Sequence, residues 1–123
     1  MSSKFSPLIV EDISDTSNSD RGSWKLKAHL HYEKFTVPAG FVTDFASVPR
    51  LPFIWLLFGD MARPPATLHD WLYTADKDGK HPVAFRALAD DIFYKACVEE
   101  GVPKWKAWMM WLGIRIGGGS HWV

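Results

Sequence analysis

Residues 64–101, PPATLHDWLYTADKDGKHPVAFRALADDIFYKACVEEG, predict two helices that reverse direction at a glycine turn. The first is expected over about 65–75, because a proline in the first helical turn gives up an amide that has no partner there. The polar run 76–79 ends it and supplies a glycine for a left-handed residue. The second is expected over about 82–101, and so short a connection makes the two helices antiparallel neighbours. Its apolar stripe recurs at helical spacing and comprises Phe85, Leu88, Ala89, Ile92, Phe93, Ala96 and Cys97.

A third helix is expected from Pro103 to the glycine run 117–119. Two interpretations fit its aromatic character. A Trp-rich helix with flanking basic residues suits a membrane interface, whereas a helical domain of this size also needs an apolar stripe for its core. Core packing is the expectation, and contact with a membrane surface is the alternative. The stripe comprises Trp105, Trp108, Met109 and Leu112, with Lys104, Lys106 and Arg115 beside it.

Upstream of these helices, the pattern changes from helical spacing to alternation. Over residues 24–32 apolar and polar side chains alternate, which predicts one strand with a solvated face. Strands are also expected over 7–12 and 35–37, with a loop at 14–22 and a proline-glycine turn at 38–40. The first forty residues therefore predict a small antiparallel sheet or meander.

Between the strands and the helices lies a segment without a clean period, residues 40–50, GFVTDFASVPR. Pro49 and Pro52 exclude a helix interior there, so a structured loop is expected, followed by a short apolar helix over 53–58. Together the patterns predict an α+β fold in a single domain, 1–123. Its parts are a β-sheet part at 1–40, the motif loop and short helix at 41–60, and a helical part at 61–123.

Composition narrows the class of protein. Fourteen basic residues balance fourteen acidic ones, so the electrostatic footprint of a nucleic-acid binder is missing. Cys97 is the single cysteine and is expected to be a buried hydrophobic residue. His29 and His31 have metal-chelating spacing, but without a third ligand nearby they are expected to be solvated. Neither a signal peptide nor a spanning segment of ~18 apolar residues is found, which favours the cytoplasm.

The strongest chemical pattern is His69-Asp70-Trp71-Leu72-Tyr73. On a helix His69 and Tyr73 share one face, and Asp70 lies beside His69. Asp90 falls at a matching height on the next helix, so it is expected to bond one ring nitrogen of His69. This fixes the tautomer and leaves the other nitrogen as a general base, while Asp70 is left to bind a hard cation such as calcium. Arg86 is expected in the surrounding shell.

The chain carries three ordered motifs, Gly40-Phe41-x-Thr43-Asp44-Phe45-Ala46-Ser47-Val48-Pro49-Arg50, His69-Asp70-x-x-Tyr73 and Arg86-x-x-Ala89-Asp90-x-x-Phe93. In these motifs it resembles a family of short phage and prophage proteins of unknown function. That resemblance implies a protein made in the host cytoplasm, with other virion or assembly proteins as partners. A second, local resemblance is to the phospholipases A2, which also place His-Asp-x-x-Tyr on one helix and an Asp on the following antiparallel helix. It implies that His69 is the general base, Asp70 the calcium ligand, and Tyr73 and Asp90 the residues that orient His69.

Other arrangements of the same residues stay open. Ser47, His69 and Asp90 have the composition of a nucleophilic triad, although no strand-turn-helix elbow surrounds the serine. Alternatively, Asp44 and Asp70 could join His69 and Asp90 around zinc or calcium.

Two functions from different classes follow. The first is a metal-assisted hydrolase of ester or lipid bonds, acting in entry or lysis, in which the loop from Thr43 to Arg50 closes over the helix pair. The second is a non-catalytic virion or assembly component. In that case Arg50 and Arg86 pair with Asp44 and Asp90 in a structural ion network.

Overall fold

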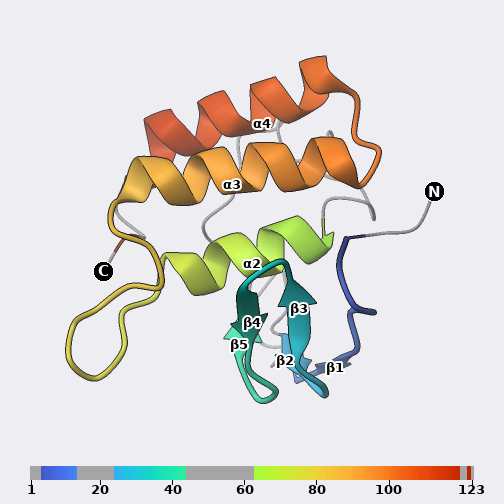
Figure 1. Ribbon diagram of the computed structural model, residues 1–123, viewed down its shortest axis with the longest axis vertical. Helices are drawn as coiled ribbons and strands as arrows, with labels where there is room; N and C mark the ends of the chain where they lie inside the picture. The colour runs from blue at the N-terminus through green and yellow to red at the C-terminus, as the bar shows by residue number, and fades with distance from the viewer. Residues whose placement is uncertain (1–3, 14–23, 44–62, 120–121, 123) are drawn as a thin grey trace.

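The computed structural model describes residues 4–13, 24–43, 63–119 and 122. Short antiparallel strands come first, and the helices α2 (Arg63–Leu72), α3 (Arg86–Glu99) and α4 (Lys104–Gly117) follow. The helices lie one above another, with α2 between α3 and the strands (Figure 1). This confirms the α+β fold. The predicted loop at 14–22, most of the motif loop and the short helix at 53–58 lie outside the described residues.

The helices α2 and α3 are antiparallel and in contact, as the sequence predicts. The α2 bounds agree with the prediction to within three residues, but α3 begins at Arg86 rather than near Pro82. Phe85 has extended backbone angles, φ −155° and ψ 157°, so the helix cannot include it. The proline signal at residue 82 therefore belongs to a loop, which accepts the fixed φ of proline as readily as a helix start does.

The connection from α3 to α4 is tight because of a glycine. Gly101 has φ 100°, a left-handed angle that an L side chain rarely adopts. This lets the Val102 amide turn back and donate to the Cys97 carbonyl at 3.0 Å. The helix α4 then starts directly after Pro103, as expected, and packs against α3.

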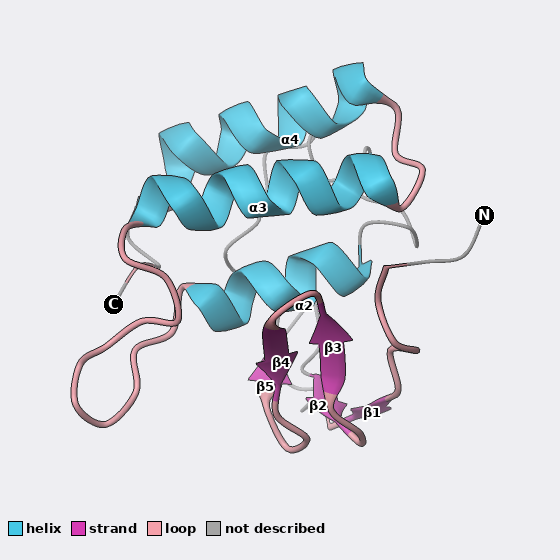
Figure 2. Cartoon of the chain, viewed as in Figure 1, coloured by secondary structure: helices cyan, strands magenta, loops and turns pink. Residues whose placement is uncertain are grey.

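The β part differs from the prediction in one respect: residues 24–32 form two strands instead of one. The strand β2 (Trp24–Leu26) pairs antiparallel with β1 (Val10–Asp12) and β5 (Val42–Thr43) in one sheet. The strand β3 (Leu30–Tyr32) pairs with β4 (Phe35–Val37) in a separate ribbon (Figure 2). The alternation of apolar and polar residues continues through the bend at 27–28, because the even-numbered residues face the core in both strands. The sequence pattern therefore cannot reveal the break.

The buried core joins the strands to the helices. Cys97 is fully buried in it, as predicted, and burial raises the pKa of its thiol. His29 and His31 lie on the exposed side of the β part: His29 Nδ1 accepts the Ala39 amide, and His31 Nδ1 contacts the Thr36 hydroxyl. The large, fully buried side chains are Tyr32, Tyr73, Phe93, Leu26, Leu30, Leu68, Leu72, Met110, Ile114, His69 and Val37.

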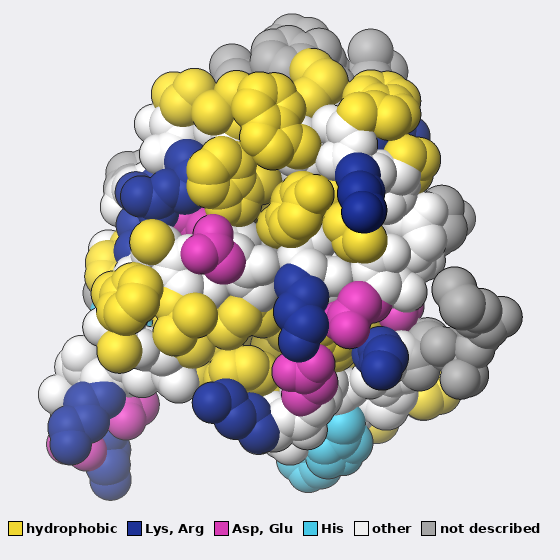
Figure 3. Space-filling model, turned by 45° about the horizontal axis from the view of Figure 1, so that its top comes forward, with side chains coloured by type: hydrophobic (Ala, Val, Ile, Leu, Met, Phe, Trp, Pro, Cys, Tyr) yellow, Lys and Arg dark blue, Asp and Glu magenta, His cyan; other side chains and the backbone are white. Residues whose placement is uncertain are grey.

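The prediction that the Trp-rich stripe of α4 packs in the core is wrong, because a different side of the helix faces inward. The face that packs inward carries Ala107, Met110 and Ile114, whereas Trp105 and Trp108 are 59% and 51% exposed. The helix is apolar on two sides, so periodicity alone could not decide which side is buried. Figure 3 brings the α4 side of the molecule forward and shows hydrophobic side chains gathered over it. Among the described helices, none combines the length and hydrophobicity that a membrane crossing requires.

Candidate functional site

The side chains of His69 and Asp90 meet across the α2–α3 contact. His69 Nε2 lies 2.7 Å from Asp90 Oδ1, and neither side chain has any exposed surface. The imidazole is held between two rings, with its centroid 4.2 Å from that of Tyr73 and 5.2 Å from that of Phe93. The ring is therefore fixed in position by packing as well as by its hydrogen bond.

Asp90 is the centre of the polar network. The Tyr73 hydroxyl donates to Asp90 Oδ1 at 2.5 Å, and a guanidinium nitrogen of Arg115 donates to Oδ2 at 2.7 Å. Burial alone raises the pKa of Asp90, but hydrogen bonds from His69, Tyr73 and Arg115 outweigh it and hold the pKa below its usual value. Asp90 is thus kept as a carboxylate although it has no contact with water.

Arg115 is a member of this network that was not predicted from the sequence. Arg115 was expected only as a basic residue beside the aromatic stripe of α4, while Arg86 was the arginine expected to pair with Asp90 in the ion-network alternative. A signal was present, because Arg115 follows the buried Ile114 on a helix that carries no acidic residue. Such an arginine has to find its countercharge on another element.

Arg86 takes a different position from the one expected under the ion-network alternative. Its Nε donates to the Tyr73 hydroxyl at 3.0 Å, and its other described contacts are the Ile114 and Arg115 carbonyls at 2.8 and 3.1 Å. Those carbonyls belong to the last turn of α4, and the Ile114 carbonyl also accepts the Gly118 amide at 2.7 Å. Burial and the Asp90 hydrogen bond raise the pKa of Tyr73 far above its usual value, so the hydroxyl stays protonated and bridges Arg86 to Asp90.

The glycines that follow α4 form one wall of the network. A Cβ on Gly118 would lie 2.6 Å from the Ile114 carbonyl oxygen and 3.4 Å from the Tyr73 hydroxyl oxygen. A Cβ on Gly119 would meet the Arg86 guanidinium at 3.6 Å, an ordinary contact. The run at 117–119, which the sequence marks only as a helix end, therefore lets the backbone approach Tyr73.

Asp70 lies beside His69 on α2 but contacts a different element. The Thr43 hydroxyl, at the end of β5, donates to Asp70 Oδ2, and the Asp70 carboxylate is nearly buried. Thr43 of the motif-loop segment thus contacts the helix that carries His69, while Asp44, Ser47 and Arg50 lie outside the described residues. Within the described ranges, no group of three or more His, Cys, Asp and Glu side chains is placed to hold a metal ion.

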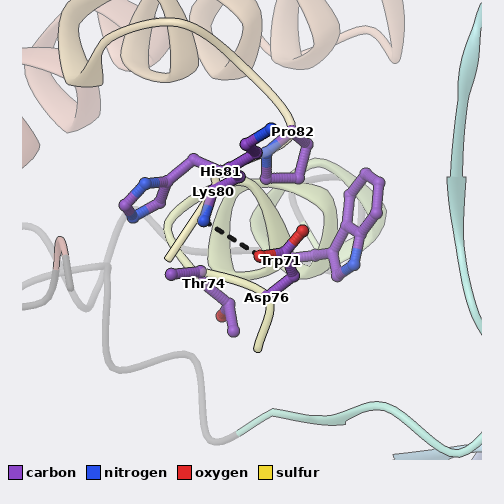
Figure 4. A pocket seen from close by; sticks show the side chains of 7 residues that line it. Trp71, Thr74, Asp76, Lys80, His81 and Pro82 are labelled. Atoms are coloured by element: carbon purple, nitrogen blue, oxygen red, sulfur yellow. Dashed lines mark hydrogen bonds between the residues drawn. The ribbon is translucent and has the colours of Figure 1, made fainter. Parts of the chain in front are cut away.

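A separate concavity lies beyond the end of α2 and does not include the network. Figure 4 shows its wall, which encloses about 280 Å³. Asp76 Oδ1 accepts the amides of Asp78 and Lys80 and so holds the loop in shape. The His81 ring stacks on Trp122 at a centroid distance of 3.7 Å, with its buried Nε2 unbonded. The labelled lining residues are Trp71, Thr74, Asp76, Lys80, His81 and Pro82.

Comparison with known proteins relates the chain to a family. The model of a family described as "Protein of unknown function (DUF1353)" matches residues 23–114, which include the strands from β2 onward and the whole His69–Asp90 contact. No curated protein and no solved structure matches the chain.

Proposed function

The chain belongs to the DUF1353 family, and we propose that it is a small hydrolase of ester bonds in which His69 is the general base. The observation that carries the proposal is the bond between His69 Nε2 and a buried carboxylate that Arg115 keeps ionised. An ionised carboxylate accepts hydrogen bonds and cannot donate one, so Nε2 carries the proton. The lone pair of the imidazole then lies on Nδ1.

This tautomer has a defined chemical use. His69 has no exposed surface, so water first has to enter the α2–α3 contact. Nδ1 then takes a proton from that water while the hydroxide forms a bond to an ester carbonyl carbon. When the tetrahedral species breaks its bond to the alcohol oxygen, the same proton returns to that oxygen, giving one acid and one alcohol. Asp90 stabilises the imidazolium that exists between the two transfers, and Tyr73 keeps the carboxylate in place.

The local resemblance to the phospholipases A2 supports a lipid ester as the substrate, in entry or lysis of a phage host. It also assigns calcium to Asp70, but the described residues do not supply a calcium set. Calcium takes six to eight oxygen ligands, whereas Asp70 accepts from Thr43 and belongs to no described cluster of acidic side chains. The steps above therefore use only the side chains of the chain itself.

A hydrolysis assay with a matched histidine control tests the proposal. Release of fatty acid from mixed phospholipid vesicles and of nitrophenol from short and long esters is measured with calcium and with a chelator. His69→Gln is expected to lower the rate roughly 10²- to 10⁴-fold, whereas His31→Gln, on the exposed side of β3, should leave it unchanged. Activity that survives in His69→Gln, or a wild type that hydrolyses none of these esters, would overturn the proposal.

A second candidate function is favoured by a different observation. His69 and Asp90 have no exposed surface, and Arg115 already neutralises the carboxylate. Both features suit a network that fixes how three helices pack, as in a non-catalytic component of a phage particle. Under this function, loss of His69 lowers the melting temperature and no ester substrate exists.

A further inference from the structure

The outer side of the α3–α4 pair carries a pocket built mainly from aromatic rings. It encloses about 270 Å³ and is lined by Asp91 and Tyr94 of α3 and by Trp108 and Trp111 of α4. Trp108 is 51% exposed, although a ring of that size is normally covered in a folded domain. Three aromatic side chains and one carboxylate thus line an open space.

Among the described residues, the carboxylate in this pocket forms no ion pair. Asp91 Oδ1 accepts the Trp111 indole N–H at 3.1 Å, which orients the carboxylate along the pocket wall. No Lys, Arg or His of the described ranges forms an ion pair with Asp91. Arg115, which contributes to the field near Asp91, is bonded to the buried Asp90 instead.

This combination selects one kind of occupant. Aromatic faces attract cations through their quadrupoles, and the attraction is greatest for cations that lose little hydration, such as quaternary ammonium groups. An anion would be repelled by Asp91, and an apolar group would bury that carboxylate without a partner, which is costly.

We propose that Asp91, Tyr94, Trp108 and Trp111 form a binding site for a quaternary ammonium group. The group is carried by a choline-type lipid headgroup or by a free choline-type solute, which present the same trimethylammonium chemistry. Lys104 lies one turn before Trp108 on the same side of α4, so a ligand that also carries a phosphate has a cation nearby on the helix.

The site is independent of the hydrolase proposal. Asp90 and Asp91 are neighbours in sequence, but Asp90 is fully buried under α4 whereas Asp91 is exposed. Loss of ester hydrolysis and loss of ammonium binding can therefore be measured separately.

Titrations followed by the indole N–H resonances of the protein test the site. Tetramethylammonium and phosphocholine are expected to shift the Trp108 and Trp111 resonances, and 3,3-dimethylbutan-1-ol, the uncharged isostere of choline, is expected to bind roughly tenfold more weakly. Asp91→Asn and Trp108→Leu should each weaken phosphocholine binding by about 3- to 30-fold. Trp105→Leu is the matched control, because Trp105 is equally exposed on α4 but does not line the pocket.

Vesicles identify the source of the group. Sedimentation with phosphatidylcholine but not with phosphatidylglycerol vesicles, lost in Asp91→Asn, assigns the site to a lipid headgroup. Binding of soluble phosphocholine without vesicle binding assigns it to a free solute. Equal binding of the uncharged isostere, or binding that neither Asp91→Asn nor Trp108→Leu weakens, would overturn the proposal.

Discussion

The stability of Asp90→Asn, compared with that of the control Asp91→Asn, measures what a buried carboxylate contributes to the fold relative to an exposed one. Asp90 accepts from His69 and Tyr73 on one oxygen and from Arg115 on the other. The asparagine side chain has the same shape but only one oxygen. Its NH₂ group therefore has to face either His69 and Tyr73 or Arg115, all of which are donors. Breaking a buried charged pair costs about 3 to 5 kcal/mol.

The expected loss lies at the lower end of that range. The Arg115 side chain retains 32% exposure, so water can replace part of its lost pairing. We expect Asp90→Asn to lower the free energy of unfolding by about 3 kcal/mol, which for a domain of this size lowers the melting temperature by roughly 10 °C. Asp91→Asn should stay within about 0.5 kcal/mol, because the amide oxygen still accepts from Trp111.

Chemical denaturation followed by circular dichroism measures both variants. If Asp90→Asn unfolds at the same denaturant concentration as Asp91→Asn, the charge of Asp90 does not hold the helices and the reasoning fails. A stability loss by itself fits both candidate functions. Ester hydrolysis by Asp90→Asn therefore has to be measured well below the melting temperature of that variant. If His69 is a general base, the variant hydrolyses esters more slowly than the wild type. If the network is purely structural, neither protein hydrolyses them.

Three further outcomes follow from the structure. Because the pKa of Asp90 is held below its usual value, its stabilisation is complete above about pH 5 and is lost as the pH falls below the unfolded value of about 3.9. The gap in melting temperature between wild type and Asp90→Asn should therefore be constant from about pH 5 to 7 and narrow below about pH 4; a gap that widens in acid would contradict this. Gly118→Ala should lower the free energy of unfolding by about 1 to 3 kcal/mol, since its Cβ would lie 2.6 Å from the Ile114 carbonyl oxygen. Gly119→Ala is the control and should leave the free energy of unfolding unchanged. Equal melting curves for the two variants would show that the backbone at Gly118 shifts without cost. The Cys97 thiol is fully buried with a raised pKa, so a thiol reagent such as Ellman's should modify it only as fast as the domain unfolds, and rapid reaction of the folded protein would disprove that burial.

The helix pair and its polar contact could be predicted because the relevant rules are local. Helical spacing placed His69 and Tyr73 on one face, and the short turn fixed the antiparallel direction of the next helix. The contact between His69 and Asp90 follows from those two facts, and the structure contains it. Whether the contact serves catalysis stays a prediction.

The parts that could not be predicted depend on the third helix and on chain bends. Arg115 reaches Asp90 only because the inward side of α4 is the one with Met110 and Ile114, and the sequence of a helix that is apolar on two sides does not show which side faces inward. The break between β2 and β3 preserves the alternation that predicted one strand. Tertiary packing decides both features.

The two arginines that tie α3 to α4 also bear on how the domain opens. Arg86, at the first residue of α3, holds carbonyls in the last turn of α4, while Arg115 from that last turn holds Asp90 of α3. Terminal helical turns ordinarily fray and exchange their amide hydrogens quickly. Fraying of this turn would expose the Asp90 carboxylate and release the Arg86 guanidinium together. We therefore expect the C-terminal turn of α4 to unfold as one cooperative unit with the first half of α3, and its amides to exchange at a rate set by opening of the whole helical part.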